Sequence, residues 1–370
     1  MARVIFRNAS YDYELLKPLF FEIMERIGGD EIRRKNRVLI KPNLLAPARP
    51  ERALLTHPSV VRAAVDYVLI KGARPFIADS PAIGSFEKVI KEGGIREALK
   101  GLDVEMREFA GSKTVDIGEP FHRVEIAKEA LDADAIINLP KLKTHSQMLL
   151  TLGVKNLFGC IVGLRKPEWH LRTGVDRDMF ARLLVQLCRR LAPSYTVLDG
   201  ILAMEGQGPG KGGTPRELGI LIGSDNAFVL DGTVCRMFGL ERAELVTNRI
   251  AGEMGLTDDH VEVDGPVPEI RDFRFPGITP LVFGPKPLHG VMRRYLVQRP
   301  VADEDLCRLC GECGKYCPAG AISRDKKQLH FDYEKCIRCY CCIEVCPYAA
   351  LRSEETLPGK MIRRLTKRNK

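Results

Sequence analysis

The chain has 370 residues, of which 45% are hydrophobic, so it is long enough for a sizeable core and for two domains. Its formal charge of +9 is compatible with nucleic acid, an acidic protein or an anionic small molecule as a partner, and charge alone does not choose among them. Asp12 and Glu14 interrupt the apolar core that a signal peptide needs, and no run of about 18 apolar residues occurs. We therefore expect a cytoplasmic protein without membrane contact.

Upstream of residue 264, apolar runs of strand length alternate with amphipathic helical patterns. Strands are predicted at 37–42, 74–79, 134–140, 195–201 and 218–223, and helices at 59–73, 85–100, 177–191 and 226–238. This alternation is typical of βαβ units. The sequence thus predicts an α/β fold with a largely parallel sheet and flanking helices.

Polar side chains follow the predicted strands at the points where these strands end. Each one alone is explained by a cap, a turn or a solvated loop, but surface loops have no reason to agree across five strand ends. Because ligands of open α/β sheets bind beyond the carboxyl ends of the strands, we expect one shared site. We assign catalysis to His57, Lys141, Lys143 and His145, and substrate binding to Lys41, Asn43, Asp79, Asn138, Lys155, Asn156 and Glu205.

These residue types indicate an anionic substrate. Lysine and amide side chains bind carboxylate or phosphate oxygens, while a histidine or a desolvated lysine moves protons near neutral pH. In "INLPKLKTH", residues 137–145, strand alternation places Lys141, Lys143 and His145 on one side and turns Leu142 to the core. His170, beside the single tryptophan, is a further candidate on a predicted loop or lid.

The rest of the chain divides by composition. Recurring prolines predict an irregular connector, and the basic residues near the C-terminus predict a solvated tail or a docking arm for an acidic redox partner or RNA. The predicted parts are an α/β domain at 1–263, a proline-rich connector at 264–300, a small cysteine-rich α+β domain at 301–350 and a basic tail at 351–370.

Nine of the twelve cysteines follow residue 306, in two copies of CxxCxxCxxxCP that begin at Cys307 and Cys336. Cytosolic thiols stay reduced, so this density indicates metal rather than disulfides. A pair of zinc ribbons would leave the third cysteine and the CP step of each copy unexplained. Over about residues 301–350 the chain resembles the bacterial dicluster ferredoxins.

The ferredoxin resemblance implies two [4Fe-4S] clusters. In two-cluster ferredoxins, three cysteines of each motif hold one cluster and the fourth cysteine holds the other. Cys341 lies outside this pattern, and we interpret it as a bystander thiol. The implied ligand sets are Cys307, Cys310, Cys313 with Cys346, and Cys336, Cys339, Cys342 with Cys317.

Several short motifs of the α/β part resemble the DUF362 family, a domain often fused to a ferredoxin module as here. That family is named for its unknown function, so the resemblance implies little about activity. The lysines and histidines at the strand ends also resemble the nickel-dependent lactate racemase fold, although its motifs do not trace residue by residue. Nickel and flavin therefore stay open as additional cofactors. The DUF362-like motifs, within about residues 5–260, are "KPNLL", "THP", "ADSP", "NLPKLKTH", "GVKNLFG", "VLDGI" and "MEGQGP".

Together these features predict an iron-sulfur oxidoreductase. Its two clusters would relay low-potential electrons from an external redox partner to an anionic small molecule at the strand ends. One alternative is an electron carrier or maturation factor for a partner enzyme. Another is an RNA-binding or oxygen-sensing regulator, which the sequence disfavours because aromatic stacking residues are not interleaved with its basic runs.

Overall fold

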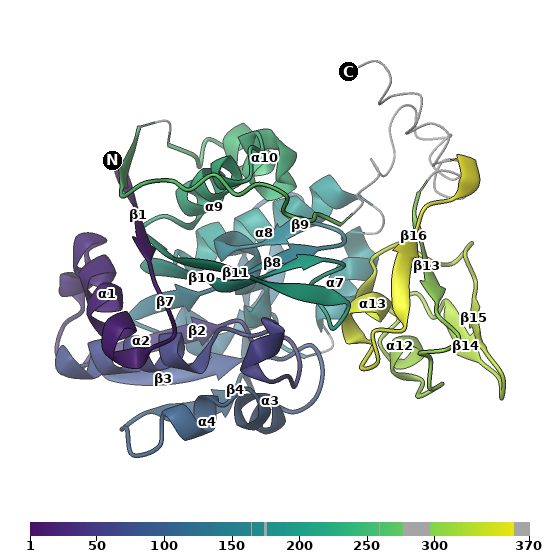
Figure 1. The fold of residues 1–370 in the computed structure, drawn as a ribbon, viewed down its shortest axis with the longest axis horizontal. Coiled ribbons are helices and arrows are strands. Elements are labelled where there is room, and N and C mark those ends of the chain that lie inside the picture. The colour runs from purple at the N-terminus through teal and green to yellow at the C-terminus, as the bar shows by residue number, and fades with distance from the viewer. Residues whose placement is uncertain (164, 174–175, 259, 277–296, 359–370) are drawn as a thin grey trace.

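The computed structural model describes residues 1–163, 165–173, 176–258, 260–276 and 297–358. Most of the predicted connector and the end of the predicted basic tail therefore lie outside the described residues. Ten described strands form one sheet with the order β12-β1-β11-β10-β7-β2-β3-β4, and β8 pairs with both β10 and β9 (Figure 1).

The main path of this sheet is parallel from β10 to β4, whereas β11 runs antiparallel to both β1 and β10. The predicted α/β class with a mostly parallel sheet is confirmed. The strands are β1 (Ala2–Asn8), β2 (Arg37–Pro42), β3 (Arg74–Asp79), β4 (Glu105–Glu108), β7 (Ala135–Leu139), β8 (Lys141–His145), β9 (Leu149–Thr151), β10 (Tyr195–Gly206), β11 (Gly213–Ser224) and β12 (Val261–Asp264).

Helices cover both faces of the sheet, which explains why apolar side chains point to both sides of its central strands. In β2, Val38 and Ile40 pack with α1 and α2 on one face, and Leu39 packs with α8 on the other. The helices are α1 (Tyr13–Arg26), α2 (Pro58–Ile70), α3 (Phe86–Glu92), α4 (Ile95–Ala98), α5 (Lys128–Leu131), α6 (Gly153–Asn156), α7 (Arg165–Thr173), α8 (Arg177–Leu191), α9 (Ala227–Met237) and α10 (Val246–Glu253). A separate hairpin joins β5 (Ser112–Asp116) to β6 (Arg123–Ala127).

Most predicted elements are present, and the differences have local causes. The helix predicted at 85–100 is divided into α3 and α4 because Gly94 takes a left-handed backbone conformation with φ 73°. The segment predicted as a loop around His170 is the helix α7. The short strand β1 was not predicted, and it is held between β11 and β12 by pairing with distant segments.

The cysteine-rich part is built from short elements beside the end of the main sheet (Figure 1). Its strands form two antiparallel pairs, β13 with β16 and β14 with β15. Its elements are β13 (Arg299–Ala302), α12 (Glu312–Lys315), β14 (Ile322–Arg324), β15 (Leu329–Phe331), α13 (Cys341–Val345) and β16 (Leu351–Glu354).

The sequence repeat is also a structural repeat. Backbone positions with positive φ recur at the same place in both copies, although only some of them are glycines. The amide of Ala321 donates to Cys317 Sγ at 3.3 Å, and the amide of Ala350 donates to Cys346 Sγ at 3.2 Å. Each cysteine loop is therefore shaped by the same turns. The paired left-handed positions are Leu309 with Arg338, Gly311 with Tyr340, and Gly320 with Ala349.

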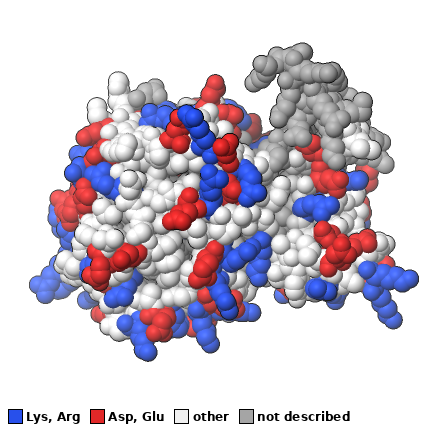
Figure 2. Space-filling model, viewed as in Figure 1, with Lys and Arg blue, Asp and Glu red and all other residues white. Residues whose placement is uncertain are grey.

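On the face shown in Figure 2, basic and acidic side chains lie interspersed over the α/β part rather than in a stripe of one sign. Among the residues that the structure describes, no helix combines the length and the apolar character needed to cross a bilayer.

A buried polar cluster around Asp199 ties the sheet to the N-terminal segment and to α2. The Asp199 carboxylate, which is 0% exposed, accepts hydrogen bonds from Tyr11 Oη (2.8 Å), Lys141 Nζ (2.8 Å) and the His57 amide (2.9 Å). The His57 ring stacks on Tyr11 with 3.5 Å between ring centroids. Burial lowers the pKa of Lys141, and the Asp199 carboxylate opposes this shift. Each of the two buried charges therefore needs the other as its counter-ion.

We expect Asp199→Ala to destabilise the fold by about 3–5 kcal/mol, because it leaves the Lys141 ammonium buried without its counter-ion. The double variant Asp199→Leu/Lys141→Met should lose much less, since it removes both charges. Urea denaturation of the two variants and the wild type measures the difference. Equal losses in the single and double variants would show that the ion pair itself is unimportant.

Candidate functional site

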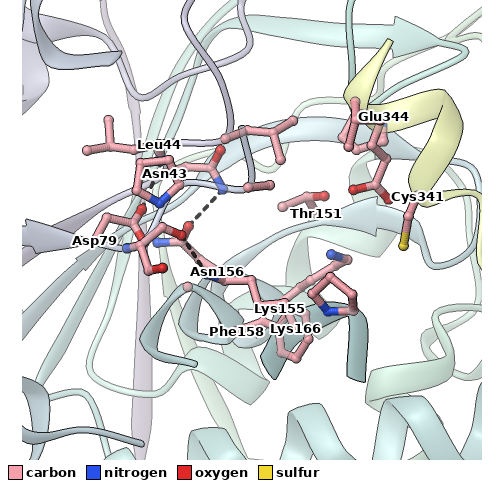
Figure 3. A pocket seen from close by; sticks show the side chains of 18 of the residues that line it. Asn43, Leu44, Asp79, Thr151, Lys155, Asn156, Phe158, Lys166, Cys341 and Glu344 are labelled. Atoms are coloured by element: carbon pink, nitrogen blue, oxygen red, sulfur yellow. Dashed lines mark hydrogen bonds between the residues drawn. The ribbon is translucent and has the colours of Figure 1, made fainter. Parts of the chain in front are cut away.

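A cavity of about 270 Å³ lies at the carboxyl ends of β2 and β3, where the sheet meets the cysteine-rich part. Residues of both parts line it, and α13 brings Cys341 and Glu344 to one side of it (Figure 3). Tyr316 and Val345 complete the contribution of the cysteine-rich part. The cavity therefore exists only where the two parts of the chain are packed together.

Amide side chains form the floor of the cavity. Asn43 Nδ2 donates to Asn156 Oδ1 at 2.8 Å (Figure 3). Behind this pair, Asn156 Nδ2 donates to Asn138 Oδ1 at 2.8 Å. Both amides have one orientation, because Asn43 Oδ1 accepts from the Lys143 ammonium and Asn156 Nδ2 donates to the Lys41 carbonyl. The floor is consequently rigid before any ligand arrives.

A buried ion pair lies beside this floor. Lys41 Nζ is 3.0 Å from Asp79 Oδ2, and both side chains are almost completely buried. Gly159 approaches the pair so closely that a Cβ atom there would lie 2.4 Å from Asp79 Oδ1 and 2.7 Å from Lys41 Nζ. Any side chain at position 159 would therefore displace the pair.

Lys143 differs from Lys41 and Lys141 in its partners. Its ammonium donates to two neutral oxygens, Asn43 Oδ1 and the Leu54 carbonyl, both at 2.7 Å. Within the described ranges no carboxylate lies at ion-pair distance from it, and burial, reinforced by Lys155, lowers the pKa of Lys143 to about 7. This lysine can gain and lose a proton near neutral pH.

Two further lysines face the cavity. Burial lowers the pKa of Lys155 and that of Lys166, the latter to about 8, so both ammonium groups lack full compensation. Lys166 Nζ donates to the Ser80 carbonyl at 2.6 Å. A bound anion would supply the missing negative charge to this group of lysines.

His145 and Glu344 link the two parts of the chain. His145 Nδ1 accepts from the amides of Gln147 (3.0 Å) and Met148 (3.2 Å), so the proton of the neutral ring lies on Nε2. His145 Nε2 is 3.0 Å from Glu344 Oε1, but the contact is not aligned as a hydrogen bond. Although burial opposes its ionisation, His145 and Lys155 lower the pKa of Glu344.

The structure divides the predicted site residues into groups. Asn43, Asp79, Lys143, Lys155 and Asn156 line the cavity, and Lys41 and Asn138 support it from behind. His145 lies at the interface with α13.

The three remaining predicted residues neither line the cavity nor contact its floor. His57 and Lys141 belong to the Asp199 cluster. Glu205 pairs with Arg274 Nε at 2.7 Å and with Arg216 at 3.7 Å. The eleven side chains therefore do not form one site. The prediction grouped them because strand position alone does not show which polar groups already have partners.

Sequence reasoning missed several lining residues. Glu344 and Cys341 come from the other part of the chain, Thr151 carries no distinctive motif, and Ser80 lies in the motif "ADSP" but was not assigned to the site. Lys166 precedes His170 by one helical turn on α7, so this spacing would have placed both side chains on the same face of a helix. Cys341, predicted to be a bystander, lines the cavity next to the ligand candidates Cys339 and Cys342.

The cysteines fit the implied clusters in number, chemistry and grouping. The four thiols of the first implied set line one small hollow. In the second set, burial raises the pKa of Cys317, and the nearby thiols of Cys339 and Cys336 act in the same direction. Eight thiols in two sets suit two [4Fe-4S] clusters, which need four thiolates each.

In comparisons with known proteins, two family models match different parts of the chain. The family model described as a domain of unknown function, DUF362, matches residues 38–236, and the model of a 4Fe-4S dicluster domain matches residues 299–347. The Thylakoid-associated protein sll1697 of Synechocystis is 36% identical over 303 residues, which are 80% of this chain and 94% of that protein.

More limited similarities concern single parts. The Electron transport protein HydN of Escherichia coli is 43% identical over 53 residues, 14% of this chain and 30% of that protein. The lactate racemase apoprotein from Thermoanaerobacterium thermosaccharolyticum has a TM-score of 0.36 and 11% identity. That match covers 53% of this chain and 49% of the racemase chain.

We expect about eight irons and about eight acid-labile sulfides per chain after anaerobic purification, as two clusters of four. Cys339→Ser should lose about half of the iron, because it removes a ligand of the second set. Cys341→Ser is the matched control, and it should keep the full content. Loss of iron in that control would show that the ligand assignment is displaced.

Lys143 should also make stability depend on pH. Because burial lowers its pKa from 10.5 to about 7, the unfolded chain binds one more proton than the folded chain between these values. The free energy of unfolding should therefore rise with pH through this window, by about 1 kcal/mol per pH unit, and Lys143→Met should lack this contribution. Urea denaturation of both proteins at two pH values inside the window tests this. Parallel profiles would mean that the ammonium is not desolvated.

Proposed function

Because the chain belongs to the DUF362 family and carries a 4Fe-4S dicluster domain, we propose that it is a ferredoxin-coupled oxidoreductase acting on an anionic small molecule in the cavity. The two clusters, when bound, supply low-potential electrons one at a time. The observation that carries the proposal is the shared wall: Cys341 and Glu344 of α13 line the same cavity as Lys143 and Lys155.

The lysines hold the substrate in this proposal. Burial desolvates Lys143 and Lys155, and the attraction of a desolvated ammonium for an anion is stronger than in bulk solution. The same charges stabilise the additional negative charge of a reduced substrate, which favours reduction over oxidation. Lys143, with a pKa of about 7, supplies a proton to the reduced product and takes up another from solvent.

Rigid neighbours keep these lysines in place. Asn43 accepts from Lys143 and is itself held by Asn156, so the ammonium is directed by a chain of two amides. His145, with its proton on Nε2, faces Glu344 and orients the wall that α13 forms. In this arrangement His145 is a positioning residue rather than a group that touches the substrate.

A second candidate function is that of an electron carrier or maturation factor for a partner enzyme. It is favoured by Cys310, a ligand candidate of the first set that is exposed at the surface. The exposed thiol equally suits entry of electrons from an external redox partner, which the oxidoreductase requires. A carrier has no need of the lysine cavity, so we prefer the oxidoreductase.

Further expectations concern partners and location. We propose an external electron donor and an anionic substrate as the partners, with no nucleic acid, since the charges on the face in Figure 2 are of mixed sign. A cytoplasmic location without membrane contact stays a prediction.

We expect Lys143→Ala to slow substrate-dependent reoxidation of the reduced clusters at least about tenfold, which is about 1.4 kcal/mol of transition-state stabilisation. Cluster content and chemical reducibility should not change. The measurement is the absorbance of the chemically reduced protein after addition of a pool of anionic metabolites. Lys100→Ala, at an exposed lysine, is the control and should behave as wild type. Equal substrate-dependent rates in both variants would support the carrier instead.

A further inference from the structure

Three buried polar atoms of the cavity lining have no hydrogen-bond partner among the residues that the structure describes. One of them, Glu344 Oε1, faces His145 Nε2 at 3.0 Å, and the other two face no described charged group at ion-pair distance. These two are Thr151 Oγ1 and His170 Nδ1, in side chains that are 3% and 6% exposed. An unsatisfied polar atom at this depth costs about 1–3 kcal/mol, so such atoms are normally occupied by a partner. Both residues line the cavity, and the missing partner is therefore expected inside it.

Thr151 lies beside the lysines. In the antiparallel pair β8–β9, Thr151 is directly opposite Lys143, so the two side chains lie on the same face of the sheet. In Figure 3, Thr151 lies between Asn156 and the α13 residues Glu344 and Cys341. Its hydroxyl therefore belongs to the same space as the Lys143 ammonium.

His170 reaches this space from α7. Its ring packs against Phe158 at 5.6 Å between centroids, and Lys155 Nζ lies 5.9 Å from the centroid of the same Phe158 ring. Burial lowers the pKa of His170 to about 3, so the ring is neutral and offers a hydrogen bond without a charge. The cavity thus combines cationic groups with two neutral polar atoms.

The charges of the lining fit a single negative charge. Three lysines line the cavity, namely Lys143, Lys155 and Lys166. The lining carboxylates are Asp79, which pairs with Lys41, and two glutamates, Glu108 and Glu344. When all three lysines are protonated, the lining carries one positive charge in excess. One carboxylate neutralises this charge, whereas a phosphate, with nearly two negative charges, exceeds it.

We infer that the cavity binds a small carboxylic acid that also carries a neutral hydroxyl or carbonyl oxygen. The carboxylate lies at Lys143 and Lys155, and the neutral oxygen bonds to Thr151 Oγ1 and His170 Nδ1. This inference rests on the proposed anion-binding role of the cavity and adds the second recognition element. The competing explanation is a water molecule that satisfies both atoms, in which case a hydroxyl or carbonyl on the ligand brings no advantage.

The test is calorimetric binding to the full chain with oxidised clusters. The probes are propanoate, butanoate and pentanoate, each also as its hydroxy acids, its oxo acids and its primary amide. We expect the best hydroxy or oxo acid to bind about tenfold tighter than the plain acid of the same length, and the amides to bind at least tenfold more weakly than their acids.

Variants test which residues make the hydroxy or oxo acid bind more tightly than the plain acid. Thr151→Val and His170→Phe, which keep the approximate size of the side chain, should each remove the advantage, so that the hydroxy or oxo acid and the plain acid bind with equal affinity to the same variant. Thr114→Val, at an exposed threonine on β5, should keep the advantage. Cluster absorbance and the urea midpoint establish that each variant is folded, and the comparison of ligands in the wild type holds without any variant.

Equal affinities for plain and hydroxylated acids, an advantage that survives in both cavity variants, or no binding by any probe would overturn the inference. These outcomes are separate from the reoxidation assay. A hydroxy or oxo acid that binds but never reoxidises the clusters would instead overturn the proposed oxidoreductase and leave the inference standing.

Discussion

Buried ammonium groups at one edge of the sheet are the constraint on which the rest of this structure depends. Desolvation of a lysine costs several kcal/mol unless an opposite charge or good hydrogen bonds compensate it. Lys41 forms an ion pair with Asp79, and Lys141 forms one with Asp199, whereas Lys143 donates hydrogen bonds only to neutral oxygens. The first two lysines are thereby committed to holding strands together. The third keeps its capacity for an external anion, and the cavity is found beside it.

The sequence predicted the layers of the fold well because their causes are local. Uninterrupted apolar runs such as 37–42 and 74–79 are long enough for strands buried on both faces, and both were found at the predicted bounds. The helix at 177–191 was likewise found at its predicted bounds, starting after Asp176, whose side chain accepts from the amides of Asp178 and Met179. The cluster ligands were predicted from the cysteine repeat for the same reason, since the spacing within each loop is local and determines which thiolates can reach one cluster.

The candidate site was predicted only in part because its causes are distant in the chain. Nothing in "KLKTH" separates Lys141 from Lys143, since the difference is made by Asp199, 58 residues away. Glu344 could not be placed at all without knowing how the cysteine-rich part packs on the sheet. Residue type and strand position therefore identify where polar groups gather. Which of them remain available is decided by tertiary partners.

The shared wall has a consequence for how such proteins are built. The short helix α13 carries the ligand candidate Cys342 between Cys341 and Glu344, which line the cavity, and the ligand candidates Cys339 and Cys346 flank the helix. In the other copy of the repeat, α12 contributes neither of these side chains, so the two halves of the module are not interchangeable. Replacing this module with that of another ferredoxin would restore electron delivery but leave a cavity of a different shape. Recombining the two parts therefore requires the cavity-facing side chains of α13 to be transferred together with the rest of the cavity lining.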